Sequence, residues 1–206
     1  MCALFKNKYH IGSIRCRGYD YSSAGRYFVT ICTKNKIPFF GNIINGTIVL
    51  SAIGKIANDE WLKTPEIRKD MNIILDEFVV MPDHFHAIII IGENRYNQCK
   101  RNYNDAQCRD AMHRVSTASA SASASASASA STPTSASVNK NSFVPQSKNL
   151  ASIIRGFKSA VTIRARIMDP GFAWQSKYYD HIIRTQIELI RIRNYIINNP
   201  SKWGKI

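Results

Sequence analysis

The feature that most constrains the fold of this chain is a pair of apolar runs, 72–81 and 84–91, separated by the turn-forming dipeptide Pro82-Asp83. Both runs are rich in β-branched residues, and such runs on either side of a short turn predict a β-hairpin. Strands joined by a tight turn are antiparallel. We therefore expect an antiparallel sheet built around this hairpin.

Two histidines stand at the start of the second run. Because side chains alternate between the two faces of a strand, His84 and His86 should share one face, with Phe85 on the other. Two imidazoles on a rigid strand can bind one divalent metal ion when a third protein ligand comes from elsewhere. The alternative is a pair of hydrogen-bonded core histidines, and the spacing alone does not separate the two.

The segments around the hairpin complete a recognisable order of elements. Further strands are expected at 26–33 and, at an edge of the sheet, at 174–184. Helices are expected after Ser51, from about Ser147, and from Gln186 to about Asn199, where Pro200 stops the last helix. Residues 39–45 are expected to form a turn region, and 47–50 a short strand or the entry to a helix. The order strand, helix, strand, strand, helix, strand, helix predicts an α+β, ferredoxin-like (split βαβ) antiparallel sheet with helices on one face plus a C-terminal helix.

The length of 206 residues fits one domain, 1–206, with an inserted flexible loop at 93–146. Within this loop, residues 119–131 alternate strictly between Ser and Ala and offer no side chain that could form a core. Such a segment is typical of a linker. A loop of this length is tolerated because the entropy of loop closure grows slowly with length.

The composition indicates a polyanionic partner. The formal net charge is +14, and residues 138–206 hold 12 Lys and Arg against 3 Asp and Glu, which contributes +9 of it. Nucleic acid is the first expectation, with an anionic membrane surface or ribosomal RNA as alternatives. No apolar run approaches the roughly 18 residues that span a bilayer, and no signal peptide is evident, so a soluble cytoplasmic protein is expected. The odd number of cysteines, with no close pair, predicts free thiols.

Two predicted helices carry polar stripes. The helix after Ser147 has no acidic residue between 148 and 168, so its basic face is expected to contact phosphates; an ordinary solvated face is the alternative. On the last helix, one stripe contains Glu188, Arg191, Tyr195 and Asn199, and the expected buried side contains Ile187, Leu189, Ile190, Ile192, Ile196 and Ile197. Tyr195 is then either a functional residue or a surface tyrosine that buries part of its ring.

Several motifs extend along the chain: Gly18-Tyr19-Asp20-Tyr21 with Tyr27 to Cys32, Met81-Pro82-Asp83-His84-Phe85-His86, Phe157-Lys158-Ser159 in the basic helix, Trp174-Gln175, Tyr179 to Arg184, and Tyr195-Ile196-Ile197-Asn198-Asn199-Pro200. Together they resemble the REP-associated tyrosine transposases, relatives of the single-tyrosine insertion-sequence transposases in the HUH nuclease superfamily. The resemblance covers nearly the whole chain except the insert. His-x-His alone is a weak signal, but its combination with a basic helix and Tyr-Ile-x-x-Asn-Pro is fairly specific.

The resemblance implies an enzyme: a metal-dependent transposase or endonuclease that nicks and transfers single-stranded DNA at or beside hairpins. It implies that His84 and His86 bind a divalent metal, Mg²⁺ or Mn²⁺, and that Tyr195 is the nucleophile that forms a 5′-phosphotyrosine intermediate. Asn199, one helical turn after Tyr195, is the candidate third metal ligand.

The expected partner is single-stranded or hairpin DNA, with no membrane; homodimer and monomer both stay open. The expected DNA-binding residues are Lys148, Arg155, Lys158, Arg166, Arg184 and Arg191. The alternatives are a non-catalytic hairpin or single-strand binding protein, another HUH enzyme such as a replication initiator or relaxase, and a basic RNA-binding protein of ferredoxin-like fold.

Overall fold

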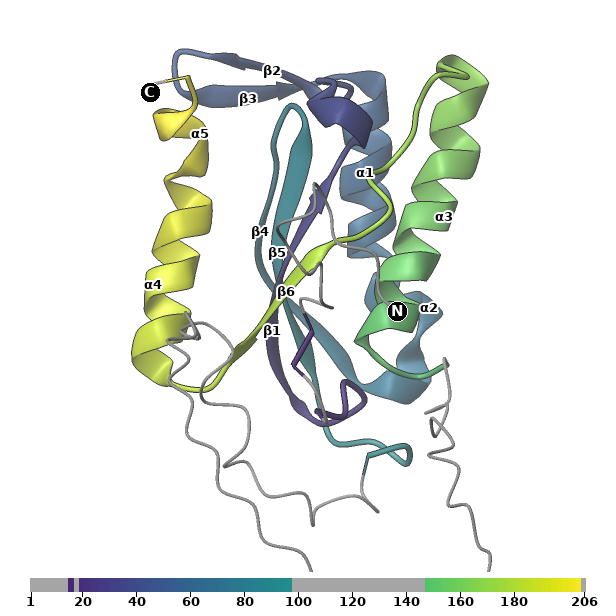
Figure 1. Cartoon of the computed structure of the whole chain (residues 1–206), viewed down its shortest axis with the longest axis vertical. Coiled ribbons are helices and arrows are strands. Elements are labelled where there is room, and N and C mark those ends of the chain that lie inside the picture. The colour runs from purple at the N-terminus through teal and green to yellow at the C-terminus, as the bar shows by residue number, and fades with distance from the viewer. Residues whose placement is uncertain (1–14, 17–18, 98–146, 205–206) are drawn as a thin grey trace, which may run out of the picture.

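The computed structural model describes residues 15–16, 19–97 and 147–204 (Figure 1). The main sheet is antiparallel, in the order β4-β5-β1-β6, and consists of β1 (Gly25–Cys32), β4 (Ile73–Val80), β5 (His84–Ile91) and β6 (Tyr179–Ile183). The predicted hairpin is confirmed as β4 and β5. The predicted α+β fold with a split βαβ order is confirmed as well, since β1, α1, β4, β5, α3 and β6 follow one another along the chain.

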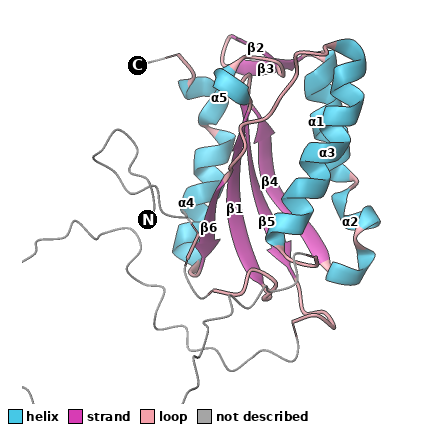
Figure 2. Cartoon of the chain, turned by 45° about the vertical axis from the view of Figure 1, so that its right-hand side comes forward, coloured by secondary structure: helices cyan, strands magenta, loops and turns pink. Residues whose placement is uncertain are grey.

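The helices lie in two layers around this sheet. They are α1 (Ala52–Leu62), α2 (Thr64–Ile67), α3 (Leu150–Met168), α4 (Gln186–Ile197) and α5 (Asn199–Lys202), with 3₁₀ turns at Lys34–Lys36 and Lys69–Met71. Helices α1 and α3 cover one face of the sheet, and α4 lies against the opposite face (Figure 2). The expectation of helices on one face plus an added C-terminal helix is therefore confirmed. None of the described helices has the length and apolar character needed to cross a membrane.

An aromatic core fills the space between the sheet and helices α1 and α3. Phe85 is fully buried, and its ring centroid lies 5.0 Å from that of Trp61 and 5.2 Å from that of Phe157. Offset and edge-to-face rings at such distances stabilise a core beyond the area that they bury. The side chains of β5 that point away from this core are consequently directed at α4.

A smaller apolar cluster joins α4 to the sheet. Leu189, Ile192 and Ile196 are buried against Phe28, Ile88 and Ile183. The prediction that Ile187, Ile190 and Ile197 are also buried is wrong, since these side chains are 82%, 49% and 58% exposed. Residues spaced three and four apart form one narrow stripe on a helix, and α4 meets the sheet only along that stripe.

A second, two-stranded sheet lies within the region expected to be a turn. Strand β2 (Gly41–Ile44) pairs with β3 (Thr47–Leu50), so the turn prediction for 39–45 is wrong over most of its length, and the strand alternative for 47–50 is confirmed. The turn itself is Asn45-Gly46, and both residues have positive φ, 51° and 75°. This dipeptide suits the tight turn of a hairpin because neither residue resists that backbone conformation.

The C-terminal helix differs from its prediction at its end. Thr185 caps α4 as expected, and its side chain accepts a hydrogen bond from the backbone N–H of Glu188. The helix ends at Ile197, and Pro200 lies in the first turn of α5 instead of ending α4. Proline is well tolerated there because the first helical N–H groups have no partner within the helix. Asn199 therefore begins a new helix and is not on the helix that carries Tyr195.

Other boundaries also shift. Strand β6 begins at Tyr179, later than predicted, and Trp174 makes only an isolated bridge to Thr33. The edge position predicted for this strand is confirmed. Free thiols were expected for all cysteines; this is confirmed for Cys32 and wrong for Cys16, which is disulfide-bonded.

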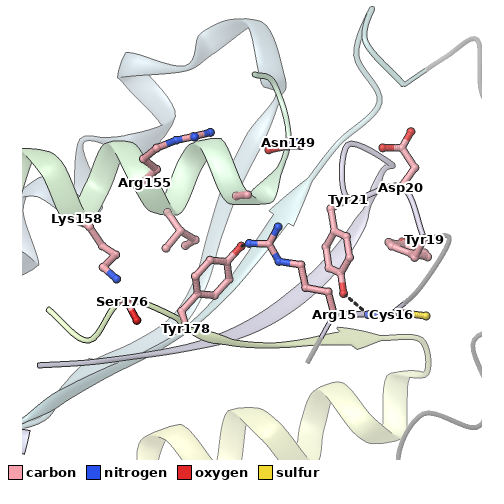
Figure 3. A pocket seen from close by; sticks show the side chains of 12 residues that line it. Arg15, Cys16, Tyr19, Asp20, Tyr21, Asn149, Arg155, Lys158, Ser176 and Tyr178 are labelled. Carbon is pink, nitrogen blue, oxygen red and sulfur yellow. Dashed lines mark hydrogen bonds between the residues drawn. The ribbon is translucent and has the colours of Figure 1, made fainter. Parts of the chain in front are cut away.

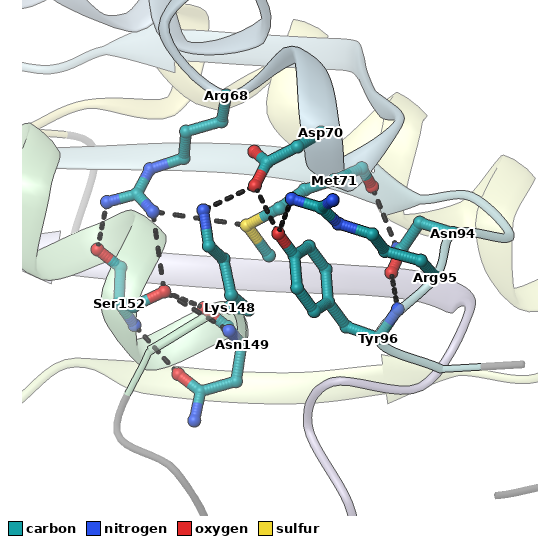
Figure 4. Close-up of polar contacts among 9 residues, drawn as sticks. All are labelled: Arg68, Asp70, Met71, Asn94, Arg95, Tyr96, Lys148, Asn149 and Ser152. Atoms are coloured by element: carbon teal, nitrogen blue, oxygen red, sulfur yellow. Dashed lines mark hydrogen bonds and ion pairs between the residues drawn. The ribbon is translucent and has the colours of Figure 1, made fainter. Parts of the chain in front are cut away.

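One carboxylate holds both ends of the inserted segment (Figure 4). Asp70 accepts a hydrogen bond from the Tyr96 hydroxyl at 2.8 Å and forms an ion pair with Lys148. The Lys148 ammonium also lies 5.3 Å from the centroid of the Tyr96 ring. Tyr96 and Lys148 flank residues 98–146, so the two ends of that segment meet at a single point of the fold.

The first residues of the predicted loop are part of this packed base. Asn94 and Asn97 are each only 8% exposed, and both donate hydrogen bonds to the carbonyl oxygen of Gly92. The packed fold therefore extends beyond residue 93, where the insert was expected to begin. The Ser-Ala segment lies outside the described residues.

The aromatic core should tolerate loss of volume at Phe85 poorly. We expect Phe85→Ala to lower the free energy of unfolding by about 3–5 kcal/mol, because a cavity remains among rings that cannot close around it. Urea denaturation measures this loss. The matched control is Ile74→Thr on exposed β4, where a change within about 0.5 kcal/mol is expected. Equal losses in both variants would contradict the core assignment.

Replacing residues 98–146 with a Gly/Ser linker should preserve the fold. A linker of about six residues reaches roughly 20 Å, enough to join ends that contact one carboxylate. Shortening the loop through about three halvings of its length should raise the free energy of unfolding by about 2 kcal/mol at most. Thermal unfolding checks this, and a midpoint lower than that of the full chain by 10 °C or so would contradict it.

Candidate functional site

The two histidines lie side by side on the face of the sheet that α4 covers. In the β1–β5 register, Cys32 lies opposite His84 and Thr30 opposite His86. The imidazole centroids are 4.5 Å apart, and Phe85 points into the aromatic core on the other face. The predicted sharing of one face is therefore confirmed, and it follows from the two-residue period of the strand.

Each imidazole is held through its Nδ1 atom by a different neighbour. The Nδ1 of His84 lies 2.5 Å from a carboxylate oxygen of Asp83, and the Nδ1 of His86 lies 2.8 Å from the hydroxyl of Thr30. When the oxygens accept these hydrogen bonds, Nδ1 carries the hydrogen and Nε2 keeps its lone pair. Hydrogen bonds of this kind orient histidines in metal sites.

The position of Asp83 is itself fixed by the end of β1. Its carbonyl oxygen accepts hydrogen bonds from both the backbone N–H and the hydroxyl of Thr33, each at 2.9 Å. Asp83 is 8% exposed. A turn fastened in this way leaves the Asp83 carboxylate little freedom, so the orientation of His84 depends on the hydrogen bonds that join the turn to the residue after β1.

Tyr195 reaches the same point from α4. Its hydroxyl lies 3.3 Å from Nε2 of His86, and its ring packs edge-on against Phe28 with centroids 6.2 Å apart. Phe28 in turn stacks on the His86 ring at 5.5 Å. Tyr195 is nevertheless 47% exposed, so the fold does not enclose this residue.

Burial determines the charge of His86. Desolvation, with a smaller contribution from the neighbouring His84, lowers the pKa of His86 from 6.5 to about 3. The ring is therefore neutral near pH 7. A neutral imidazole is the form that binds a metal ion or accepts a hydrogen bond through Nε2.

The donor set fits a divalent metal in part. Two neighbouring imidazoles with fixed Nδ1 atoms suit one ion, but the described residues contain no group of three His, Cys, Asp or Glu side chains that could hold it. An amide or hydroxyl oxygen is the other kind of side-chain ligand that the described residues offer. Asn199 begins α5, and no hydrogen bond within the described residues joins it to either histidine. Trp203, which follows α5, brings its ring to 5.6 Å from that of His84.

The structure separates the predicted DNA-binding residues into two groups. Lys148, Arg155, Lys158 and Arg166 belong to α3 and its start, so the sheet lies between them and Tyr195 (Figure 1). Within the fold, Lys148 contacts Asp70, Lys158 contacts the carbonyl of Gln175, and Arg166 contacts the carbonyl of Phe172.

The other two predicted cations lie toward α4. Arg184 follows β6, and Arg191 is on α4 with a side chain 78% exposed, 3.9 Å from Glu188. Glu188 also contacts Nε2 of His181 at 2.7 Å. The basic residues therefore do not form one surface around Tyr195, although the sequence suggested no such division.

Sequence reasoning missed Thr30, Asp83, Phe28 and Trp203 as neighbours of this site. Asp83 adjoins the histidine motif, but the Pro82-Asp83 pair indicated only a turn. Thr30 and Phe28 have no local signal, because their place depends on the register between β1 and β5. Trp203 depends on the direction of α5, which the sequence did not predict.

A comparison of the sequence with known proteins finds one informative relative. No protein-family profile matches the chain. An uncharacterised protein of Haemophilus influenzae (strain Rd) is 35% identical over 199 residues, covering 95% of this chain and 91% of the relative.

Among solved structures, a REP-associated tyrosine transposase bound to a REP hairpin is similar in fold. It has a TM-score of 0.52 and 15% identity, over 93% of this chain and 75% of that one. A candidate transposase of Deinococcus radiodurans R1 aligns at a TM-score of 0.37 and 14% identity, over 89% of this chain and 95% of that one. The first likeness supports the four-stranded antiparallel fold with its helices.

Thr30 should control the ring of His86. We expect Thr30→Val to leave the buried Nδ1 without a partner, lowering the free energy of unfolding by about 1–3 kcal/mol and changing the ¹⁵N shifts of the His86 ring. Thr30→Ser keeps the hydroxyl and should restore the wild-type shifts. Thr47→Val, on exposed β3, is the matched control. Unchanged His86 shifts in Thr30→Val would show that the hydrogen bond does not set the tautomer.

Proposed function

We propose that this protein is a metal-dependent HUH transposase or endonuclease acting on single-stranded DNA. The chain belongs to the same family as the uncharacterised Haemophilus influenzae protein. It nicks and rejoins DNA through a 5′-phosphotyrosine on Tyr195. The observation that carries this proposal is the 3.3 Å contact between the Tyr195 hydroxyl and Nε2 of His86, with the His84 ring beside it. These two motifs are 109 residues apart in the sequence, so their meeting is not a consequence of local structure.

Two further observations support it. The sequence motifs resemble those of the REP-associated tyrosine transposases, and the solved structure of similar fold is a protein of that name bound to a REP hairpin. The net charge of +14 suits a polyanionic partner such as single-stranded or hairpin DNA. A cytoplasmic location and a single domain, 1–206, accompany this proposal, with an inserted segment that begins after the packed Asn97.

The chemistry assigned to Tyr195 is an in-line transesterification. Its hydroxyl oxygen attacks the scissile phosphorus; the new P–O bond to tyrosine forms as the P–O3′ bond breaks. The tyrosine loses a proton and the leaving O3′ gains one, which gives a free 3′-hydroxyl. The covalent link conserves the phosphodiester bond energy, so a 3′-hydroxyl of another strand can attack it, reverse the step and join the strands.

The residues around Tyr195 support this chemistry by position. Phe28 packs against the rings of both Tyr195 and His86 and limits how the two can move relative to one another. The pKa of an ordinary tyrosine is about 10, so its hydroxyl needs electrostatic help at pH 7. The half-exposed ring leaves room for a phosphate to approach this hydroxyl from solvent.

A divalent ion, Mg²⁺ or Mn²⁺, would be held by Nε2 of His84 and His86, with Asn199 as the proposed third ligand. When bound, it supplies a Lewis acid that stabilises negative charge on the scissile phosphate. Asp83 and Thr30 contact the two Nδ1 atoms, which leaves the Nε2 atoms as the candidate ligands, and burial keeps His86 neutral.

Removing one hydroxyl should abolish the covalent step. With hairpin oligonucleotides that carry single-stranded flanks and Mn²⁺, we expect wild type to form a protein–DNA adduct on denaturing gels and Tyr195→Phe to form none. The dissociation constant for DNA should change by no more than about twofold, because only an oxygen is lost. Tyr96→Phe, which removes the same atom from a tyrosine that contacts Asp70, is the matched control. An adduct that persists in Tyr195→Phe would refute the assigned nucleophile.

Loss of either imidazole should remove the metal-dependent formation of the protein–DNA adduct. We expect His84→Ala and His86→Ala each to reduce adduct formation by at least about 100-fold with Mg²⁺ or Mn²⁺, a loss comparable to that from disrupting a metal site. Undiminished adduct in both variants would exclude the metal role. Tight DNA binding by wild type without any adduct, across several hairpins and both metals, would identify a non-catalytic binding protein.

A further inference from the structure

A second site lies on the side of the sheet away from Tyr195, at the beginning of α3 (Figure 3). It is a pocket of about 620 Å³, within the size range of small-ligand sites. Its lining includes Arg15, Tyr21, Arg155, Lys158 and Tyr178. These residues come from three parts of the chain, so the fold and not a local motif creates the pocket.

The pocket combines positive charge with aromatic rings. Three of its lining residues are cations and three are tyrosines, the third being Tyr19. The acid in its lining, Asp20, accepts hydrogen bonds from the backbone N–H and hydroxyl of Ser22, at 3.0 and 2.7 Å. This chemistry favours a ligand that has both an anionic group and a flat ring, as a nucleotide has.

Two tyrosine rings hold the guanidinium of Arg15 in this pocket. Its guanidinium carbon lies 5.8 Å from the ring centroid of Tyr21 and 5.2 Å from that of Tyr178, and the group donates a hydrogen bond to the Tyr178 hydroxyl at 2.9 Å. Buried Asp180 lies 3.9 Å from the same guanidinium. A guanidinium fixed against two rings adds positive charge beside them, which favours an anionic ligand that carries a flat base.

Two cations lie along α3 at the pocket, three residues apart. Arg155 is exposed on α3, and Lys158 is half-buried, with its ammonium 5.9 Å from the Trp174 ring centroid. Residues three apart share one side of a helix, so both charges add to the positive potential of the pocket, although their head groups point in different directions (Figure 3). Lys158 donates one hydrogen bond, to the carbonyl oxygen of Gln175, and an ammonium has three donors.

The edge of the sheet connects this pocket with the Tyr195 side. Tyr178 lines the pocket, whereas the next residue, Tyr179, lies opposite Thr30 on the other face. The Tyr179 ring is 6.3 Å from that of Phe28, which contacts both His86 and Tyr195. Consecutive residues thus place one ring on each face of the sheet at β6. The outer edge of this strand pairs with no other described strand.

We infer that the pocket binds an unpaired nucleotide of the single-stranded DNA substrate, at a position away from the phosphodiester that reacts. The inference rests on the proposed function for the identity of the ligand. The phosphate lies at Lys158, with Arg155 adding positive charge nearby, and the base stacks on the tyrosine rings beside Arg15. The DNA strand then passes over the outer edge of β6, beside Tyr179, to reach Tyr195.

The test compares two hairpin oligonucleotides by fluorescence anisotropy, one blunt and one with a flank of four thymidines. We expect the flank to tighten binding to wild type by at least fivefold. Arg155→Gln and Lys158→Gln should each lose most of this gain while binding the blunt hairpin within twofold of wild type. The salt dependence, as log Kd against log salt concentration, should also become shallower by about 0.7 for each phosphate contact removed. Thermal unfolding verifies that each variant folds.

Lys55→Gln is the matched control, because it removes one exposed charge from α1, outside the pocket. The same binding series in Tyr195→Phe separates the two proposals: the gain from the flank should persist there, whether or not wild type forms an adduct. A flank that adds no affinity would overturn the inference. Equal weakening of both oligonucleotides by Arg155→Gln and Lys158→Gln would also overturn it, because the charges would then act without regard to an unpaired nucleotide.

Cross-linking gives an independent result. With 5-iododeoxyuridine in the flank, ultraviolet light should join the DNA to Tyr178 or Tyr21, as located by peptide mass spectrometry. Cross-links confined to α4 would place the flank on the other side of the sheet and overturn the inference.

Discussion

The pairing of β1 with β5 is the constraint on which the rest of the structure depends. Its register puts Thr30 opposite His86, and it fixes which residues of β5 face α4. A slip of one residue would exchange the two faces, sending Phe85 to the face that α4 covers and both histidines into the aromatic core. The packing of Phe85 against Trp61 and Phe157 therefore also protects the histidine pair, since any register that loses these ring contacts is disfavoured.

Helix α4 provides the other half of the site, and its attachment is narrow. Three apolar residues hold it to the sheet, and Arg193 adds two hydrogen bonds to the Asp76 carboxylate on β4, at 2.9 and 2.6 Å. A bidentate pair fixes direction as well as distance. Tyr195 lies between Ile192 and Ile196 in sequence, so its ring emerges at the border of the buried stripe, close to the sheet but still half-exposed.

Much of this arrangement could be predicted from the sequence, because it depends on local periodicity. The alternation of β5 gave the shared face of His84 and His86, and the turn dipeptide before it gave the hairpin. What could not be predicted depends on pairings between distant segments. Thr30 becomes a neighbour of His86 only through the register, and the basic face of α3 is separated from Tyr195 because the chain crosses to the other side of the sheet. The exposed Ile187, Ile190 and Ile197 show the same limit. An apolar pattern does not predict the width of the sheet surface against which the helix packs.

The single carboxylate of Asp70, bonded to residues on both sides of the long insert, also bears on how such a chain can change over generations. A segment whose two ends meet at one anchored point is nearly independent of the domain in its length. Additions and deletions between those ends leave the sheet, α3 and the histidine pair in place. Selection for a stable fold therefore does not act strongly against such changes in length. A repetitive, compositionally simple stretch can accumulate there without disturbing the body that carries it, and the same position suits the experimental insertion of a second domain.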